Sequence, residues 1–277
     1  MKVTITKITA HKRFKQRYHL FFNKGNGEEY GFSIDEDVLI KRGIKKGLEI
    51  DQEELEQIVD EDEKKKTYHL SIHYLSYRMR SVFELVEYLQ GKERKKEHIE
   101  YTVQLLLEQK LLNDEEFAKS FVRTKKNTQL KGPLKLKQEL KQKGISEAII
   151  EGALREFSFA EQIEKLTKWL MKQKPSMRES AHALKQKQQN RLQAKGFSHA
   201  VIQIAYDEVD ADLDNDSDQD AEWQALCFQA EKLKRKYKTK YNTYEYEQKL
   251  KQGLYQKGFP IDEITRFIEK DKENETF

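Results

Sequence analysis

One apolar pattern recurs four times in this chain of 277 residues and constrains its fold more than any other feature. The pattern is a leucine followed ten residues later by an isoleucine: Leu89 and Ile99, Leu140 and Ile150, Leu192 and Ile202, Leu254 and Ile264. Three of the four copies also carry a Lys-Gly turn before an apolar residue, at 143–145, 195–197 and 257–259. A helical unit of about fifty residues is marginally stable alone, so the repetition predicts tandem units that share buried faces with their neighbours.

The second copy indicates that each unit contains three helices. Asn113 is a favourable N-cap, and Phe117 and Phe121 follow it at helical spacing. Gly132-Pro133 interrupts the chain and starts a second helix, because proline fits a first helical turn and not a helix interior. Lys143-Gly144 ends that helix with the residue that best tolerates a left-handed backbone, and a third helix follows.

The first fifty residues differ from the rest, since their apolar side chains alternate with polar ones as in half-buried strands. The apolar members of this pattern are Val3, Ile5, Tyr18, Leu20, Phe22, Tyr30, Phe32 and Ile34. The segment 23–28 is typical of a hairpin turn, and its glycines lack the G-x-G-x-x-G spacing of a phosphate-binding loop. We therefore expect a small β segment, then a short helix over 35–42 and a connector that ends at residue 66.

The composition favours an extended array over one large globular core, because 36% of the residues are charged and only three are proline. We predict a mainly α protein, an elongated array of four tandem three-helix repeats preceded by a small N-terminal β segment. The expected boundaries are 1–66 for the β segment and its connector, 67–112, 113–157 and 158–206 for the first three repeats, 207–220 for an acidic linker, and 221–277 for repeat 4 and the tail.

The acidic linker explains why the last interval of the repeat is the longest. Residues 207–220 hold eight carboxylates in fourteen positions. A calcium-binding EF-hand loop needs glycine at its sixth position and glutamate at its twelfth, and registers that start at Asp210 or Asp212 supply neither. The pattern predicts a solvated, mobile segment before the fourth repeat.

Motifs for catalysis and for metal binding are missing from the sequence. His69 and His73 have the spacing of two ligands on one helix, but no third ligand accompanies them, and Cys227 is the only cysteine. There is no nucleophile elbow, Walker loop or Cys-His pair, so we expect a protein that is not an enzyme and has no cofactor or metal. No apolar stretch has the length of a signal peptide or a membrane span, which favours a cytoplasmic location.

Basic residues gather in three places and are the candidate binding residues. The stretch between Glu116 and Glu139 has seven basic side chains and no acid, and basic residues with neighbouring tyrosines also lie at 74–80 and 232–244. We single out Arg78, Arg80, Lys119, Arg123, Lys125, Lys126, Lys131, Lys135, Lys137, Lys234, Arg235, Lys236 and Tyr237. Such clusters suit phosphates through charge neutralisation and base stacking. Lysines near helix C-termini also complement the helix dipole and keep a protein soluble, which is the alternative interpretation.

The second copy of the pattern also resembles a known family. Its D-x-x-FA-x-x-FVR, its KGP and its helix ending in EL-x-x-KGI are similar to the second repeat of the RecX family, bacterial proteins that regulate the RecA recombinase. The matching positions are Asp114, Phe117, Ala118, Phe121, Val122, Arg123, Lys131, Gly132, Pro133, Leu140, Lys143, Gly144 and Ile145. The resemblance extends over residues 68–270, and long members of the family also begin with a small β segment.

The resemblance implies a non-catalytic regulator that lies along the helical groove of the RecA filament on single-stranded DNA. Such a protein inhibits ATP hydrolysis and strand exchange by RecA and acts in DNA repair, recombination and the SOS response. The implied partners are the RecA nucleoprotein filament and, weakly through phosphates, single-stranded DNA, and we expect a monomer with no membrane contact. The alternative is a basic helical-repeat protein that binds DNA or RNA directly, and its affinity should fall with added salt.

Overall fold

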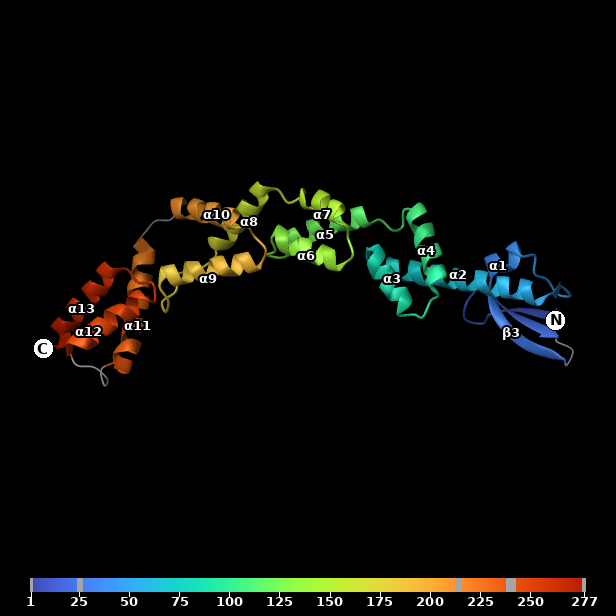
Figure 1. Ribbon diagram of the computed structural model, residues 1–277, viewed down its shortest axis with the longest axis horizontal. Helices are drawn as coiled ribbons and strands as arrows, with labels where there is room; N and C mark the ends of the chain where they lie inside the picture. The colour runs from blue at the N-terminus through green and yellow to red at the C-terminus, as the bar shows by residue number, and fades with distance from the viewer. Residues whose placement is uncertain (1, 24–26, 213–215, 238–242, 276–277) are drawn as a thin grey trace. The chain divides into compact units, whose positions relative to one another are not determined.

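The structure, a computed structural model, describes residues 2–23, 27–212, 216–237 and 243–275 (Figure 1). The chain forms two compact units, one of Met1–Ala118 with Lys141–Ile149 and the other of Lys119–Leu140 with Ile150–Phe277. The described residues form one small sheet and thirteen helices, so most of them are helical.

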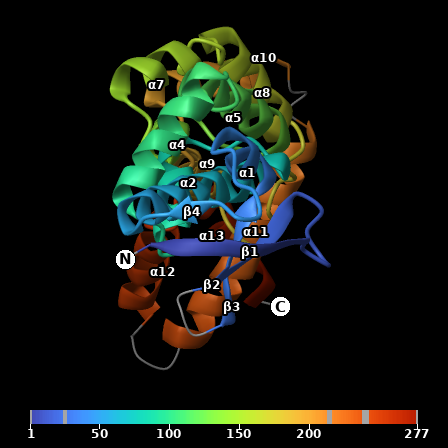
Figure 2. The same cartoon turned by 90° about the vertical axis from the view of Figure 1, so that its right-hand side faces the viewer.

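An antiparallel sheet opens the chain, with its strands in the order β3-β2-β1-β4 (Figure 2). The strands are β1 (Val3–Ala10), β2 (Arg17–Asn23), β3 (Glu28–Asp35) and β4 (Glu49–Ile50). One face of the sheet packs on α1 (Glu36–Lys41) and on the first turns of α2 (Gln52–Ser76). The buried cluster between them is apolar and includes Ile5, Leu20, Ile34, Val38 and Ile58. Burial of these side chains holds the sheet and the two helices together.

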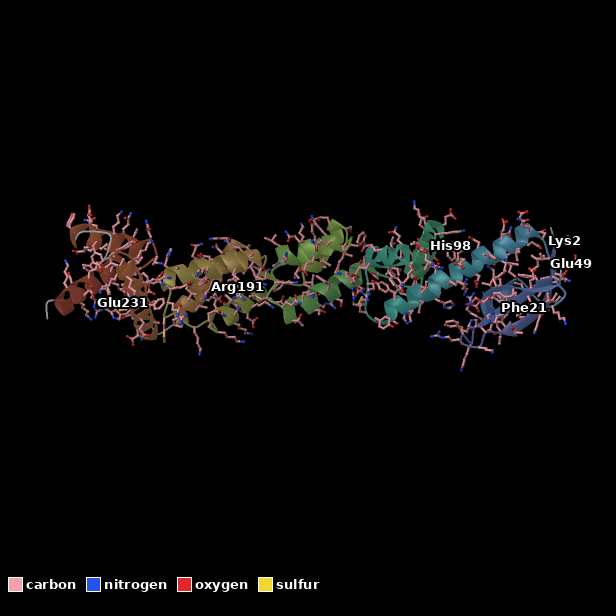
Figure 3. The ribbon with its side chains drawn as sticks, turned by 90° about the horizontal axis from the view of Figure 1, so that it is seen from below. Lys2, Phe21, Glu49, His98, Arg191 and Glu231 are labelled. Carbon is pink, nitrogen blue, oxygen red and sulfur yellow. The ribbon has the colours of Figure 1, made fainter. Side chains whose placement is uncertain are left out.

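A β-bulge in β3 decides which of its side chains face the core. Gly31 is an extra residue, because Tyr30 pairs with Phe21 while Phe32 pairs with Leu20. The bulge turns the side chains on its two sides to opposite faces of the sheet. Phe32 therefore packs on the core, whereas Tyr30 is 56% exposed and pairs with Phe21 on the other face. Figure 3 labels Phe21 on the sheet. The predicted alternation fails at Tyr30 for this reason.

Helix α2 joins the sheet to the first repeat as one element of 25 residues. It begins at a capping box, in which Asp51 accepts a hydrogen bond from the backbone nitrogen of Glu54 at 2.8 Å and Glu54 accepts one in return. The connector expected before residue 66 is therefore helical, and it continues without a break into the first helix of repeat 1.

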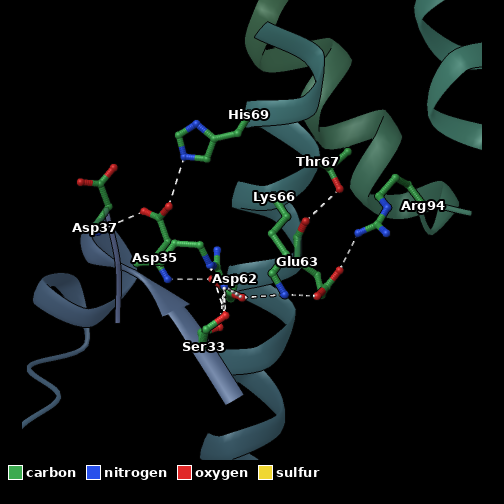
Figure 4. A network of polar contacts seen from close by, with 10 residues as sticks. Ser33, Asp35, Asp37, Asp62, Glu63, Lys66, Thr67, His69 and Arg94 are labelled. Atoms are coloured by element: carbon green, nitrogen blue, oxygen red, sulfur yellow. Dashed lines mark hydrogen bonds and ion pairs between the residues drawn. The ribbon is translucent and has the colours of Figure 1, made fainter. Parts of the chain in front are cut away.

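Polar contacts also fix α2 against the sheet (Figure 4). Asp62 is 2% exposed and accepts hydrogen bonds from Arg17 and from the backbone nitrogen of Asp35, each at 2.8 Å. Its neighbour Glu63 forms an ion pair with Arg94 at 2.8 Å, from the loop before α4. Buried carboxylates need such donors to offset the loss of hydration. The sheet, α2 and the first repeat are thereby tied together.

Each of the four repeats contains three helices. Repeat 1 combines α2 with α3 (Val82–Gln90) and α4 (Lys96–Glu108), and repeat 2 has α5 (Asp114–Thr128), α6 (Pro133–Gln142) and α7 (Glu147–Leu154). Repeat 3 has α8 (Phe159–Leu170), α9 (Ala181–Ala194) and α10 (His199–Asp212), and repeat 4 has α11 (Asp216–Tyr237), α12 (Thr243–Tyr255) and α13 (Ile261–Glu275). The four leucines of the repeated pattern are 0% exposed and the four isoleucines at most 4%. A mainly α fold of three-helix repeats after a small β segment is confirmed.

Two helices take in most of the acidic segment 207–220. Helix α10 continues to Asp212 and α11 begins at Asp216, while residues 213–215 lie outside the described residues. We predicted a linker without regular structure over 207–220, whereas the described residues of this segment are helical.

The Lys-Gly turns end their helices and also receive a hydrogen bond from the preceding repeat. Gly144, Gly196 and Gly258 have φ angles of 73°, 91° and 88°, in the left-handed region that favours glycine. In each turn the lysine carbonyl accepts a bond from the start of the preceding repeat's second helix. The donors are Ser81 Oγ to Lys143 at 2.8 Å, the Gly132 nitrogen to Lys195 at 2.8 Å, and Ser180 Oγ to Lys257 at 2.6 Å. One contact thus recurs three times.

The backbone N–H of the first residue in two of these second helices also has a partner from the following repeat. The backbone nitrogen of Val82 donates to Asp114 at 2.8 Å, and that of Ala181 donates to Glu222 at 2.7 Å. Asp114 is the first residue of the next repeat's first helix, α5, and Glu222 lies in the corresponding helix α11, in its second turn. Pro133 occupies the corresponding position in repeat 2, and it has no N–H to satisfy.

We predict that Gly196→Ala lowers the free energy of unfolding by about 2 kcal/mol. The positive φ disfavours a side chain, and an added Cβ would lie 2.4 Å from the backbone nitrogen of Lys135. Gly152→Ala in α7 is the matched control, because a Cβ there meets no atom within 4 Å and alanine favours a helix. Urea unfolding of both variants checks the prediction, and equal stability would contradict it.

Candidate functional site

The α5–α6 basic surface comprises Lys119, Arg123, Lys125, Lys126, Lys131, Lys135 and Lys137. Helix α5 starts where Asn113 Oδ1 accepts hydrogen bonds from the backbone nitrogens of Glu115 and Glu116, at 2.9 and 3.0 Å. Helix α6 starts at Pro133. All seven basic residues belong to the second compact unit, on these two helices and the link between them.

Carboxylates from beyond α7 neutralise part of this surface. Arg123 forms a bidentate ion pair with Glu156, with 2.7 Å between Nη2 and Oε1, and Lys126 Nζ lies 2.8 Å from Glu161 Oε1. The hydrogen bonds from Arg123 and from Lys126 lower the pKa of Glu156 and of Glu161 respectively. Although the sequence between Glu116 and Glu139 contains no acid, the folded surface does, because Glu156 and Glu161 lie against it.

The members of the surface differ in exposure. The side chain of Arg123 is 56% exposed, whereas Lys126 is 16% exposed and Lys131, paired with Glu139 at 2.5 Å, is 22% exposed. Lys125 lies over the ring of Phe121 at 5.6 Å. The others, Lys119, Lys135 and Lys137, are half-buried. Arg123 is thus well placed to meet a partner, and Lys126 and Lys131 mainly hold their helices.

The predicted cluster near the end of α11 divides in the same way. Lys234 is 14% exposed, and its ammonium group lies 2.6 Å from Asp271 in α13. Arg235 and Lys236 are exposed, and Lys236 lies over the ring of the half-buried Tyr237 at 5.7 Å. Residues 238–242, which include further basic residues of this cluster, lie outside the described residues.

The third cluster is engaged within the first repeat. Arg80 lies over the ring of Tyr74 at 4.2 Å, and Tyr74 stacks on Tyr88 with 4.0 Å between ring centroids. Arg78 forms an ion pair with Glu84 at 3.0 Å. These contacts hold α3 against the end of α2.

Glu84 connects this cluster to the next Lys-Gly turn. It accepts a hydrogen bond from Lys143 at 2.6 Å as well as those from Arg78, and its side chain is 13% exposed. Burial is the largest influence on its pKa and raises it. The bonds from Arg78, Lys143 and the Ser81 backbone outweigh burial and bring the pKa of Glu84 down to about 2.

A fourth group of basic residues lies at the N-terminus and is not among the three predicted clusters. The first 27 residues contain seven lysines and arginines and no acid. Lys7, Lys12, Arg13 and Lys15 form no ion pair with any residue in the described ranges. The signal was the same absence of acids that identified the α5–α6 stretch. For these four residues the described part of the structure supplies no carboxylate, whereas Lys2 and Arg17 of the same segment pair with Glu49 and Asp62.

The two histidines with metal-ligand spacing bind different groups. His69 Nε2 lies 3.1 Å from Asp35, and His73 Nε2 lies 3.2 Å from the hydroxyl of Tyr77 (Figure 4 shows the first contact). Within the described ranges no three His, Cys, Asp or Glu side chains come together as a metal site. None of the helices described is long and apolar enough to cross a membrane.

Models of protein families match most of the chain. A regulatory protein RecX N-terminal domain matches residues 3–51, and the first and second three-helix domains of RecX match 68–106 and 113–154. The third three-helix domain of RecX matches twice, at 160–205 and at 220–268. Repeats 3 and 4 are thus both similar to one domain of that family.

Named relatives and solved structures agree with these matches. The chain is 48% identical over 265 residues to the regulatory protein RecX of Halalkalibacterium halodurans, covering 95% of this chain and 98% of the relative. It is 42% identical over 266 residues to that of Bacillus cytotoxicus, covering 96% and 97%. A crystal structure of regulatory protein RecX is similar with a TM-score of 0.59 and 35% identity, covering 74% of this chain and 99% of that one. The RecX structure from Lactobacillus salivarius gives 0.51 and 32%, covering 54% and 98%.

We predict that Glu84→Gln lowers stability at pH 7 by about 2 kcal/mol. Because folding lowers the pKa of Glu84, its contribution is complete above about pH 5 and is lost as the pH falls towards 2. The difference between the wild type and the variant should therefore shrink over that range. Urea unfolding at pH 7, 5 and 3 measures it, with Glu87→Gln on the exposed side of the same helix as the control. A difference that stays constant with pH would contradict the assignment.

Proposed function

The chain belongs to the RecX family, and we propose that it regulates RecA by binding the RecA filament on single-stranded DNA and inhibiting its ATPase and recombinase activities. In this role it catalyses no reaction itself and acts in the cytoplasm, in DNA repair and recombination. The observation that carries the proposal is the match of RecX family models to the N-terminal segment and to all four repeats. The relatives' name, regulatory protein RecX, supports a regulatory role.

The repeated architecture supports a filament as the target. A filament presents the same protomer surface many times, and four similar three-helix repeats offer similar helix faces in series. When one contact has formed, the next is made at a high local concentration, so several weak contacts together bind tightly. A free RecA protomer offers only one such surface, so it should bind far more weakly than the filament.

The α5–α6 basic surface is the part of the chain that we assign to the filament. The ion pair of Arg123 with Glu156 is exposed, and exposed pairs contribute only about 0–1 kcal/mol. A phosphate or a carboxylate of the partner can therefore replace Glu156 at small cost. Lys125, two residues further along α5 and half-buried, is also assigned to this contact, together with the exposed Arg235 and Lys236 of α11.

We expect the protein to suppress ATP hydrolysis by RecA on single-stranded DNA when present at less than one copy per RecA protomer. A coupled ATPase assay during titration measures this, and a parallel titration contains excess single-stranded DNA. Suppression that persists with excess DNA identifies the filament as the target. If added DNA relieves the suppression, the suppression comes from competition for the strand, and inhibition through contact with the filament is refuted.

The double variant Arg123→Ala/Lys125→Ala should weaken this inhibition about tenfold, because it removes two charges assigned to the contact. It keeps Lys126 and Lys131, whose ammonium groups are mostly covered and pair with Glu161 and Glu139, so its thermal stability should change little. Lys45→Ala/Lys46→Ala is the control, since it removes two exposed lysines from the β segment. Undiminished inhibition by the folded double variant would remove this surface from the proposal.

A further inference from the structure

Five aromatic rings form a connected series on the outer face of the N-terminal sheet and its first loop. The consecutive centroid distances are 5.0 Å from Phe14 to His11, 4.6 Å from His11 to His19, 5.5 Å from His19 to Tyr30, and 5.7 Å from Tyr30 to Phe21. Lys7 lies over the ring of Phe21 at 5.5 Å. We call these six residues the aromatic sheet face.

Two bulges bring this face together. Thr6 is an extra residue in β1, as Gly31 is in β3, so Lys7 pairs with Phe21 and Phe21 pairs with Tyr30. Directly paired residues lie on the same face of a sheet. Without the bulges, the alternation of the strands would turn parts of this row towards the core. The two bulges therefore place these side chains together on the face of the sheet that points away from its apolar core.

The face exposes large aromatic groups to solvent. Tyr30 is 56% exposed and Phe14 is 54% exposed, although the core of the sheet lies on the opposite face. Single exposed aromatic side chains are common, but a connected series is typical of a binding surface. Flat rings on a β-sheet offer stacking positions for other flat rings.

The surroundings of these rings are basic. Lys7, Lys12, Arg13 and Lys15 have no ion pair within the described part of the chain, and Arg13 lies over the ring of Phe14 at 5.9 Å. Burial, the largest influence, and the charges of neighbouring basic groups lower the pKa of His11, which favours its uncharged ring. The rings thus provide stacking, and the lysines and arginines provide the positive charge.

An open groove of about 770 Å³ continues from Phe14 along α2. Its basic lining includes Arg13 and Lys15, which have no ion pair within the described residues, and Lys66, which pairs with Asp62 and Glu63. The enclosed Asp35 contributes an acid that His69 contacts. A chain that crosses the sheet and passes Phe14 meets further positive groups in this groove. The acids closest in sequence to the rings, Glu28 and Glu29, lie at the start of β3, ahead of Tyr30.

We propose that the aromatic sheet face binds single-stranded nucleic acid directly, with bases stacked on Tyr30 and Phe14 and phosphates on Lys7, Arg13 and their neighbours. Exposed rings among unpaired cations are the combination by which proteins bind single strands with little sequence preference. An acidic peptide would use the cations but would leave the rings without a stacking partner, so a nucleic acid explains both parts of the surface. The binding needs no RecA, and it uses residues other than those of the α5–α6 basic surface.

Fluorescence anisotropy of the full chain with a labelled oligothymidylate of about twenty nucleotides tests the proposal without RecA. Phe14→Ala/Tyr30→Ala should weaken binding about thirtyfold, because stacking on two bases is lost, and should leave the salt dependence unchanged. Phe14→Tyr/Tyr30→Phe keeps two flat rings and should bind as the wild type does. Tyr255→Ala removes a tyrosine that is 61% exposed in α12 and is the matched control.

The charge variant Lys7→Gln/Arg13→Gln should make the log–log salt slope shallower by about 1.4, at roughly 0.7 for each phosphate contact. Thermal melting of every variant confirms that the sheet is folded. Wild-type affinity in the folded Phe14→Ala/Tyr30→Ala variant would overturn the proposal. Binding of a labelled polyglutamate peptide, with none of the oligothymidylate, would overturn it in favour of an acidic protein partner.

Discussion

The lysine carbonyl of each Lys-Gly turn makes the contact on which the repeated architecture depends. A helix leaves its last carbonyls without partners, and here the partner comes from the preceding repeat, from Ser81, Gly132 or Ser180. The glycine that follows has both the left-handed backbone and the missing side chain that let the two segments approach. Neither side of such a contact is satisfied alone, so neighbouring repeats stabilise one another.

Local patterns predicted the helical part of the fold well. Helical spacing and turn chemistry act within a few residues, so the repeated leucines and isoleucines could be assigned to the core from the sequence. The bulge at Gly31, by contrast, shifts the period of β3 by one residue and moves Tyr30 to the other face. The partner of Arg123 is 33 residues away, at Glu156, and a charge pattern along the chain does not show such a contact.

The two groups of basic residues differ in what a phosphate must displace. At Arg123 and Lys126 it must replace a carboxylate that already satisfies the cation. At Lys7 and Arg13 it displaces mobile counterions and water, and the release of counterions itself favours binding. The stretch 119–137 and the N-terminal segment look alike when only their charges are counted. The two segments differ in the folded protein, because Arg123 and Lys126 have carboxylate partners and Lys7 and Arg13 have none among the described residues.

The direction of the turn contacts has a consequence for synthesis on the ribosome. Each donor precedes its acceptor along the chain, by 62 residues for Ser81 and Lys143 and by 77 for Ser180 and Lys257. A newly made second helix therefore emerges with its N-terminal contact unmade, and it waits until the second helix of the following repeat has been translated. The contacts between repeats therefore form in order from the N-terminus to the C-terminus, and each forms only after the next repeat has been synthesised.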